Sequence, residues 1–299
     1  MAKKFKDLMN LAKSREAKRV SVAMAGDRDV LMSVKMAVDE GVIDPILVGD
    51  KLEIEKISNS IGLDLKGIRL IDEKDKTQAA RISTELVSSG EASILMKGLV
   101  DTSIIMKQVL DKEIGLRSDN LMSHVAIFDI ETYHKLFLVT DAAMNIAPDL
   151  MEKKGLIDNA VEVSQSLNID NPKVAVLAAK EKVSDKMEAT VDAGKLAEMS
   201  KQGEIEGCIV DGPFALDNAI SKESARVKGI DSEVAGDADI LLAPDIEAGN
   251  VLYKSLTFLG GAKSAGIIVG AKAPIILTSR ADNEETKLHS IVLATLMVD

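Results

Sequence analysis

Short β-rich runs alternate with longer helical patterns along almost the whole chain, and this alternation constrains the fold more than any other feature. Residues 20–26 form an apolar run that ends at a glycine, the helical pattern that follows stops at Gly41, and residues 45–49 form the next apolar run. A strand, a helix and a second strand in this order make a βαβ unit, whose strands are parallel. The repeated pattern therefore predicts a doubly wound α/β fold, with helices on both faces of each sheet.

The alternation is interrupted once, between residues 115 and 140. Two strand patterns, residues 124–128 and 135–139, lie only six residues apart. Because this gap is too short for a helical crossover, it predicts an antiparallel hairpin. We place a domain boundary near residue 118.

Two helical patterns near the end of the chain carry further predictions. In residues 248–259, Leu252, Leu256 and Leu259 recur on one face, and Gly260 follows the last of them. This spacing predicts one α-helix that ends at the glycine. Residues 282–297 predict a final helix, capped by Asp282, that packs back on the first domain.

Composition excludes several classes of protein. The chain of 299 residues carries 37 basic and 48 acidic side chains, a formal net charge of −11, which argues against a nucleic-acid partner. Cys208 is the only cysteine and lies in an apolar run, so we expect a buried strand residue rather than a reactive thiol. No apolar run approaches the roughly 18–20 residues that span a bilayer, so we expect a cytoplasmic protein with no membrane partner.

Four predicted strands end in polar or small residues. Lys97 and Gly98 follow one strand, Asp141 follows the second, Asp211 and Gly212 follow the third, and Asp245 follows the fourth. In open α/β sheets, ligands bind at the carboxyl ends of the strands. Each aspartate or glycine alone is an ordinary turn residue, but the set favours one ligand-binding cleft.

A serine and an arginine, Ser279 and Arg280, stand between the last predicted strand and the last predicted helix. Free N–H groups at the start of a helix and a guanidinium group both bind anions. The pair therefore indicates an anionic substrate. Taken alone, it is equally compatible with a helix cap and a surface ion pair.

Several familiar motifs are missing from the sequence. The chain has no Gly-x-x-x-x-Gly-Lys-Ser/Thr, no Gly-x-Gly-x-x-Gly and no Gly-x-Ser-x-Gly, which disfavours a P-loop NTPase, an ordinary Rossmann dehydrogenase and an α/β-hydrolase. The three histidines, His124, His134 and His289, have no metal-ligand spacing, so no metal site is expected. Of these, His124 opens a predicted strand and could reach the cleft.

Six segments together resemble the phosphate acetyl/butyryltransferase family, and they occur in order along nearly the whole chain. They are Met-Lys-Gly-Leu-Val-Asp-Thr at residues 96–102, Ser-His-Val-Ala-Ile-Phe at 123–128, Val-Thr-Asp-Ala-Ala-Met-Asn-Ile-Ala-Pro at 139–148, Val-Asp-Gly-Pro-Phe-Ala-Leu-Asp at 210–217, Ala-Pro-Asp-Ile-Glu-Ala-Gly-Asn at 243–250 and Thr-Ser-Arg at 278–280. The first three segments look closer to phosphate butyryltransferases than to phosphate acetyltransferases.

The resemblance implies two α/β domains like those of isocitrate and isopropylmalate dehydrogenases, with the active site in a cleft between them. In the family the last strand and helix belong to the first domain, so residues 1–118 plus 271–299 form the first domain and residues 119–270 form the second. It implies an acyltransferase that interconverts acyl-CoA plus phosphate with acyl phosphate plus CoA, by direct attack in a ternary complex. Coenzyme A is then a substrate, and no metal or redox cofactor is needed. The family also associates, so a homo-oligomer is expected.

The family's site residues can be assigned to this sequence at the positions where the motifs match. Ser279 and Arg280 match the family's Ser-Arg pair, where the serine hydrogen-bonds near the thioester and the arginine binds phosphate. In the acetyltransferases an aspartate follows seven residues after that serine, proposed as the base for the CoA thiol. Here that position is Thr286, so Asp282 becomes the candidate carboxylate, with Glu285 also near.

The remaining residues are assigned to substrate binding. Lys107 falls closest to an arginine that the acetyltransferases carry in the helix after their Ser-Gly motif. The full substrate-binding set implied is Lys97, Gly98, Lys107, Ser123, His124, Asp141, Asp211, Gly212, Asp245 and Asn250.

Three alternative functions stay open at this point. A phosphate acetyltransferase differs only in the length of the acyl chain. An NAD(P)-dependent 2-hydroxy acid dehydrogenase of the same fold would need an aspartate cluster for a divalent metal. A CoA-binding protein without activity would bind CoA but cleave no thioester.

Overall fold

A computed structural model describes residues 3–279 and 282–298, and its contacts divide the chain into two compact units. The N-terminal unit comprises Phe5–Asn120 and Ala265–Asp299, and the central unit comprises Leu121–Ser264 with Met1–Lys4. The sequence places these boundaries near residues 118 and 270. None of the helices in the described part of the chain is long and apolar enough to cross a membrane.

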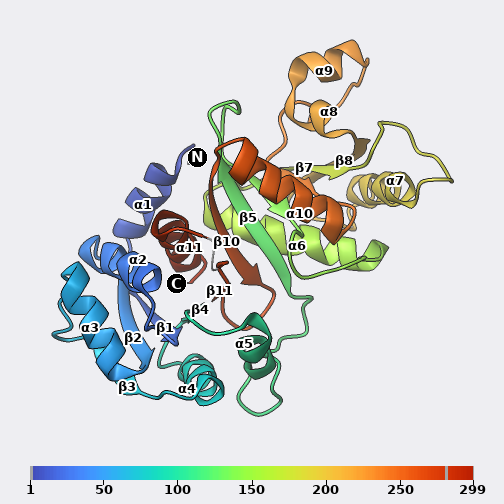
Figure 1. The fold of residues 1–299 in the computed structure, drawn as a ribbon. Helices are drawn as coiled ribbons and strands as arrows, with labels where there is room; N and C mark the ends of the chain where they lie inside the picture. The colour runs from blue at the N-terminus through green and yellow to red at the C-terminus, as the bar shows by residue number, and fades with distance from the viewer. Residues whose placement is uncertain (1–2, 280–281, 299) are drawn as a thin grey trace. The chain divides into compact units, whose positions relative to one another are not determined.

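The N-terminal unit is a doubly wound α/β structure (Figure 1). Its elements in chain order are α1 (Phe5–Lys13), β1 (Lys18–Ala23), α2 (Arg28–Asp39), β2 (Ile43–Gly49), α3 (Lys51–Ile61), β3 (Arg69–Asp72), α4 (Lys76–Ser88), β4 (Ile94–Lys97), α5 (Thr102–Val109), β10 (Lys263–Val269), β11 (Ile275–Ile276) and α11 (Glu284–Leu296). The strands are ordered β3-β2-β1-β4-β11-β10. All neighbours pair in parallel except β10 and β11, which are antiparallel.

Helix caps explain where the helices of this unit begin. Asp27, Asp50 and Asp75 precede α2, α3 and α4, and each carboxylate accepts hydrogen bonds from N–H groups of the first turn. Asp27 is the N-cap of α2, with its carboxylate accepting from Asp29 N and Val30 N. The predicted final helix is also found, and α11 packs against α1 and α2.

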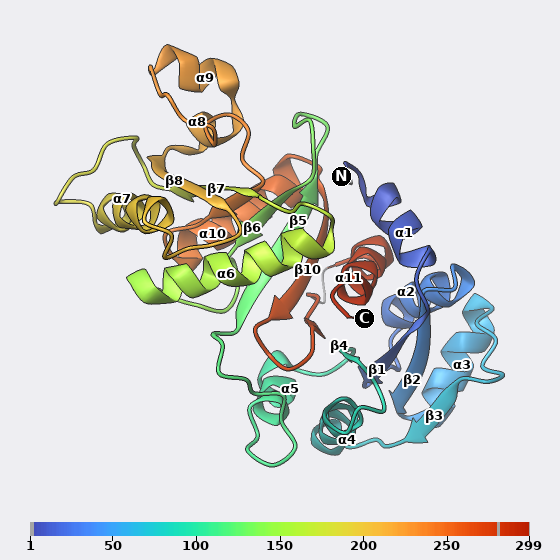
Figure 2. The ribbon, with the colours of Figure 1, turned by 180° about the vertical axis from the view of Figure 1, so that it is seen from behind.

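The central unit is a second α/β structure. Its elements are β5 (Ser123–Asp129), β6 (Phe137–Thr140), α6 (Leu150–Ser166), β7 (Lys173–Leu177), α7 (Glu188–Lys201), β8 (Ile209–Phe214), α8 (Leu216–Ile220), α9 (Lys222–Val227), β9 (Ile240–Leu242), α10 (Ile246–Lys254) and the π-helical turn η1 (Ser255–Leu259). The strands are ordered β5-β6-β9-β7-β8. Helices α6 and α7 cover one face of this sheet, and α10 lies on the other (Figures 1 and 2).

The predicted hairpin is confirmed. Strands β5 and β6 pair antiparallel, with Phe128 opposite Phe137. Both rings are buried, and Tyr133 from the connecting loop packs edge-on against Phe137 and donates a hydrogen bond to the carbonyl of Ala238 at 2.8 Å. The few aromatic residues of the chain thus gather in this part of the core.

The helix predicted over residues 248–259 is wrong in its last turn. α10 ends at Lys254, and η1 carries the chain on to Leu259 with a hydrogen bond from Gly260 N to Ser255 O at 2.9 Å. A π-type turn holds more residues than an α-turn, so the residues after it are rotated about the axis. Leu252 and Leu256 pack on the core, whereas Leu259 is 87% exposed.

The structure also corrects the end of the third predicted strand. Asp211 and Gly212 lie inside β8, which continues to Phe214, rather than after it. The pairing of β8 with β7 shifts between Ala175 and Leu177, so that β8 contains extra residues at a β-bulge. The bulge lets the strand continue past the glycine and proline that read as a turn in the sequence.

Cys208 lies immediately before β8 and is 9% exposed. Burial, followed by the charge of Asp158, raises the pKa of its thiol to about 11. A thiol that stays protonated is a poor nucleophile, which agrees with the prediction of an unreactive cysteine.

A group of charged residues connects the amino ends of β6, β7 and β9. Lys173 Nζ donates to Asp237 at 2.7 Å, Lys135 Nζ donates to Asp239 at 2.5 Å, and His134 Nε2 lies 2.9 Å from Asp237. Burial alone would raise the pKa of Asp237, but the hydrogen bond from Lys173 and the charge of Lys135, with His134, hold that pKa well below its usual range.

We expect Asp237→Asn to lower the free energy of unfolding at pH 7 by about 1.5–3 kcal/mol, because hydrogen bonds to a charged group are lost. The folded-state pKa of Asp237 is depressed, so its contribution is present above the unfolded pKa of about 4 and disappears as pH falls through the folded pKa. Urea unfolding from pH 7 to pH 3 should therefore show the gap between wild type and variant closing at low pH. Asp231→Asn, at an exposed site, is the matched control and should show no gap; a constant gap for Asp237→Asn would contradict the prediction.

Candidate functional site

A small cavity of about 160 Å³ lies in the N-terminal unit, at the carboxyl ends of its parallel strands. Its lining side chains come from four places: the end of β4, the start of α2, the segment after β11 and the first turn of α11. They are Asp27, Val30, Lys97, Gly98, Leu99, Thr278, Ser279 and Lys287. Three of them, Lys97, Gly98 and Ser279, belong to the sequence-predicted site.

Strand pairing brings these distant residues together. Within the sheet, β4 pairs in parallel with β1 on one side and with β11 on the other, so that Met96 stands opposite Val22 and Ile276. The carboxyl ends of three strands therefore meet at one edge, which is where α/β sheets bind ligands.

Gly98 is required for this close arrangement. Its N–H donates to Ala23 O at 2.8 Å, and the next N–H donates to Met24 O at 2.8 Å. A Cβ at position 98 would lie 2.3 Å from Met24 O and 2.7 Å from Ala23 O. Only glycine lets the end of β4 approach the end of β1 so closely.

Two buried lysines give the cavity a positive character. Lys97 is 6% exposed and Lys287 is 4% exposed. Lys97 Nζ lies 3.4 Å from the carbonyls of Gly98 and Val100, and Lys287 Nζ donates to the carbonyl of Asp282. Asp27 also lines the cavity, but its carboxylate already accepts the N–H groups of Asp29 and Val30 as the cap of α2. Such a site suits an anion.

Ser279 and Asp282 contact each other ahead of α11. The N–H of Ser279 donates to the carboxylate of Asp282 at 2.7 Å, and Ser279 itself is exposed. Arg280, the other half of the predicted pair, lies outside the described residues.

The predicted cap of the final helix is wrong by one residue. Asn283 caps α11 and accepts the N–H of Thr286 at 2.9 Å, because the carboxylate of Asp282 is engaged with Ser279 instead. Asp282 therefore stabilises the loop that presents Ser279. Lys107, the remaining predicted residue of this unit, lies exposed on α5 and is not part of the cavity lining.

A second group of predicted residues lies in the central unit, around the loop after β6. Asp141 is 2% exposed, and its carboxylate accepts hydrogen bonds from the N–H groups of His124, Ala143 and Met144 and from the side chain of Asn145. Donors from the protein thus occupy both carboxylate oxygens. They hold the loop in one conformation.

Helix α10 packs closely on this loop. Asn250 donates from its side chain to Ala142 O at 3.1 Å, and a Cβ on Gly249 would lie 2.1 Å from Asp141 O. Asp245 caps the same helix by accepting the N–H of Ala248 at 2.8 Å. The ends of β6 and β9 therefore form one compact group.

The start of β5 completes this group. Ser123 is fully buried and accepts a hydrogen bond from Asn159 at 2.8 Å, and the ring of His124 lies 5.9 Å from that of Tyr253. Asp211 and Gly212 do not join it, because β9 and β7 separate β8 from β6 in the sheet. Asp211 accepts the N–H of Gly212 at 2.8 Å.

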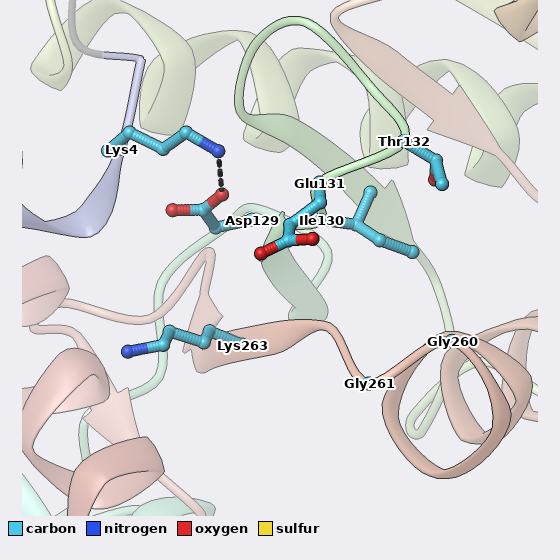
Figure 3. A pocket seen from close by; sticks show the side chains of 8 residues that line it. All are labelled: Lys4, Asp129, Ile130, Glu131, Thr132, Gly260, Gly261 and Lys263. Atoms are coloured by element: carbon cyan, nitrogen blue, oxygen red, sulfur yellow. Dashed lines mark hydrogen bonds and ion pairs between the residues drawn. The ribbon is translucent and has the colours of Figure 1, made fainter.

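Two larger cavities of the central unit lie at the other edge of its sheet. One, of about 380 Å³, is lined by residues 129–132 at the end of β5 and by Gly260, Gly261 and Lys263, and here Lys4 donates to Asp129 at 2.6 Å (Figure 3). The other, of about 410 Å³, surrounds the Asp237 group at the amino ends of β7 and β9. Because ligands of α/β sheets bind at the carboxyl ends, neither cavity is a candidate for the main site.

The sequence reasoning missed Lys287. It lies in α11 at the start of a run in which nearly every side chain is buried. A lysine next to such an apolar run is an unusual choice, since lysine is rarely buried without a partner, and this is the signal that could have revealed it.

Comparison with known proteins places the chain in a family. The family described as phosphate acetyl/butaryl transferase matches residues 4–85 and 73–295. The chain belongs to the phosphate acetyl/butyryltransferase family. The phosphate butyryltransferase of Clostridium beijerinckii is 50% identical over 297 residues, which cover 99% of this chain and 98% of that protein.

Solved structures agree with this membership. A branched-chain phosphotransacylase from Enterococcus faecalis V583 superposes with a TM-score of 0.82 at 35% identity, covering 94% of this chain and 98% of that one. A 4-hydroxythreonine-4-phosphate dehydrogenase from Klebsiella pneumoniae, at 13% identity and a TM-score of 0.58, covers 94% of this chain and 99% of its own, and shows the fold alone. The dehydrogenase-like α/β fold expected from the sequence is thus confirmed.

We expect Gly98→Ala to destabilise the protein by at least about 1–3 kcal/mol, because the added methyl group meets main-chain oxygens that cannot turn away. Gly26→Ala is a matched control in the segment between β1 and α2, where a Cβ would meet only the Glu53 side chain at 3.7 Å. That change should stay within about 0.5 kcal/mol of wild type. Chemical denaturation measures both, and equal stabilities for the two variants would show that the approach of β4 to β1 tolerates a side chain.

Proposed function

We propose that this protein is a phosphate acyltransferase that interconverts short-chain acyl-CoA plus phosphate with acyl phosphate plus CoA, with butyryl-type acyl groups preferred. The observation that carries the proposal is the anion-binding cavity at the strand ends, lined by Lys97 and the family's serine, Ser279. The 50% identity to a phosphate butyryltransferase supports the choice of acyl group.

The proposed reaction is a direct transfer in a ternary complex. An oxygen of hydrogen phosphate attacks the thioester carbonyl carbon, so that a C–O bond forms and the C–S bond breaks. The electron pair of that bond leaves with sulfur, and the proton of hydrogen phosphate ends on the CoA thiolate. Holding both substrates together supplies part of the rate enhancement, because an encounter in solution is replaced by a step inside one complex.

Residues of the N-terminal unit stabilise the negative charges of the substrates and of the transition state. Arg280 binds the phosphoryl group and stabilises the charge that develops in the transition state, and Lys97 adds a second positive charge. Ser279 donates its hydroxyl near the thioester carbonyl. Asp282 positions Ser279 by accepting a hydrogen bond from the Ser279 N–H. In this proposal the Asp282 carboxylate also takes part in proton transfer.

The remaining predicted residues belong to the same proposal. Lys107 on α5 contributes charge for the CoA phosphates. In the central unit, acyl-CoA is bound by the loop that Asp141 holds, together with Ser123, His124, Asp245 and Asn250. Asp211 and Gly212, on strand β8, also contribute to substrate binding.

No metal or redox cofactor takes part in the proposed reaction, with CoA serving as a substrate. The proposal includes a homo-oligomer, which the exposed apolar side chains of Val251, Phe258 and Leu259 on α10 and η1 support.

The reaction is tested by release of CoA thiol from acyl-CoA, with and without phosphate. Acetyl-, propionyl-, butyryl-, isobutyryl- and valeryl-CoA are compared at equal concentration. We expect thiol release that requires phosphate and is fastest with four-carbon acyl groups. Fastest turnover of acetyl-CoA would favour a phosphate acetyltransferase, and CoA binding without any phosphate-dependent cleavage would exclude the enzyme.

Arg280→Ala should lower kcat/KM for acyl transfer at least tenfold, because one charged donor to the transition state typically contributes a factor of about 10²–10³. Arg226→Ala serves as the control, since that arginine is exposed on α9 and pairs with Glu223. Near wild-type turnover by Arg280→Ala would remove this arginine from the mechanism.

A further inference from the structure

We propose that Lys287 is a second phosphate-binding residue, which holds the phosphoryl group of the substrate together with Lys97. The inference rests on the proposed function and deepens it. Its basis is the geometry of the cavity and a comparison of the buried lysines within this one chain.

Lys287 differs from Lys135 and Lys153, two other deeply buried lysines. Lys135 and Lys153 are 8% and 5% exposed, and each donates to a carboxylate, that of Asp239 at 2.5 Å and that of Asp192 at 2.6 Å. Buried ammonium groups normally need such a counter-charge. Lys287 is equally buried, yet within residues 3–279 and 282–298 it donates to the main-chain carbonyl of Asp282 and forms no ion pair with a carboxylate.

The counter-charge for Lys287 is therefore expected from a ligand. Its side chain lines the cavity that also contains Lys97 and Ser279. Among the described residues of the lining, Asp27 carries the only carboxylate, and the first N–H groups of α2 donate to it. A phosphate dianion beside Lys287 would supply that counter-charge, and the positive charge of Lys97 in the same lining would add to the attraction.

The size of the cavity restricts what that anion can be. Its volume of about 160 Å³ is well below the roughly 300–1,000 Å³ of sites that enclose a drug-sized ligand. A single phosphoryl group fits such a space, whereas a nucleotide does not. Lys287 thus contacts phosphate, or the phosphoryl end of acyl phosphate, and leaves the CoA moiety to other residues.

The fold holds Lys287 firmly in this place. It lies in the first turns of α11, whose following side chains are buried, and the carbonyl of Asp282 fixes the ammonium group beside the Ser279 loop. A phosphate-binding group on a rigid helix keeps its geometry while the substrate changes.

The test compares Lys287→Met with wild type in the complete protein. Methionine removes the charge while keeping an unbranched side chain of similar length. We expect KM for phosphate to rise by about 10–100-fold, as for loss of one hydrogen bond to a charged group, while KM for butyryl-CoA stays within about twofold. Lys287→Arg should recover most of the affinity for phosphate, which a purely structural role would not require.

A measurement of phosphate binding by thermal stability complements the kinetic test. Inorganic phosphate should raise the melting temperature of wild type and should do so much less for Lys287→Met. Lys56→Met is the matched control, because it removes an equal charge from exposed helix α3 of the same unit; it should retain the wild-type response to phosphate.

The outcomes separate this inference from the proposed function. An active wild type with an unchanged KM for phosphate in Lys287→Met would overturn the role of Lys287 alone. An inactive wild type whose stabilisation by phosphate is lost in Lys287→Met would overturn the function and leave the phosphate site standing. If Lys287→Met does not fold, a crystal structure of the wild type with phosphate tests the inference instead. The anion should lie within hydrogen-bond distance of Lys287 Nζ. A phosphate bound elsewhere would overturn the role of Lys287.

Discussion

The parallel pairing of β11 with β4 is the constraint on which the site depends. Ile275 and Ile276 come late in the chain, after the whole central unit, yet they pair with Leu95 and Met96. This short strand follows β10 and lies next to β4, so the residues after it are close to Lys97. The segment with Ser279 and the helix with Lys287 then follow directly, so that one two-residue pairing positions both sides of the cavity.

How far the sequence predicts this protein depends on the range of each interaction. Strand and helix positions follow from local periodicity, and the β5–β6 hairpin follows from the short gap between two strand patterns. The π-turn at Ser255–Leu259 and the bulge at Asp211 depend on packing against neighbouring strands, so no local sequence pattern predicts them. The short helices α8 and α9 have too few residues to show a period.

For the candidate site, local sequence patterns likewise predict where residues lie but not what each side chain does. A polar residue after a strand predicts where a ligand binds, and Lys97 and Ser279 do meet in one cavity. The same pattern does not say what each polar side chain does. Asp141 satisfies main-chain N–H groups of its own loop, and Asp282 holds the N–H of Ser279 rather than capping α11. An aspartate that follows a strand can fix a backbone or contact a substrate, and the choice depends on donors that folding brings near.

The charge balance of the cavity also bears on the carboxylate that the family pattern places at Thr286. In the proposed direction, hydrogen phosphate brings the proton that ends on sulfur, so no protein base is needed to complete the transfer. In the reverse direction the CoA thiol must lose a proton, and nearby cations favour a thiolate by lowering the pKa of a thiol. In the proposed mechanism, the two lysines that line the cavity supply that effect through their charge. In the proposed mechanism, the positive charge of the site favours the thiolate without a dedicated protein base, and a threonine at position 286 is compatible with activity.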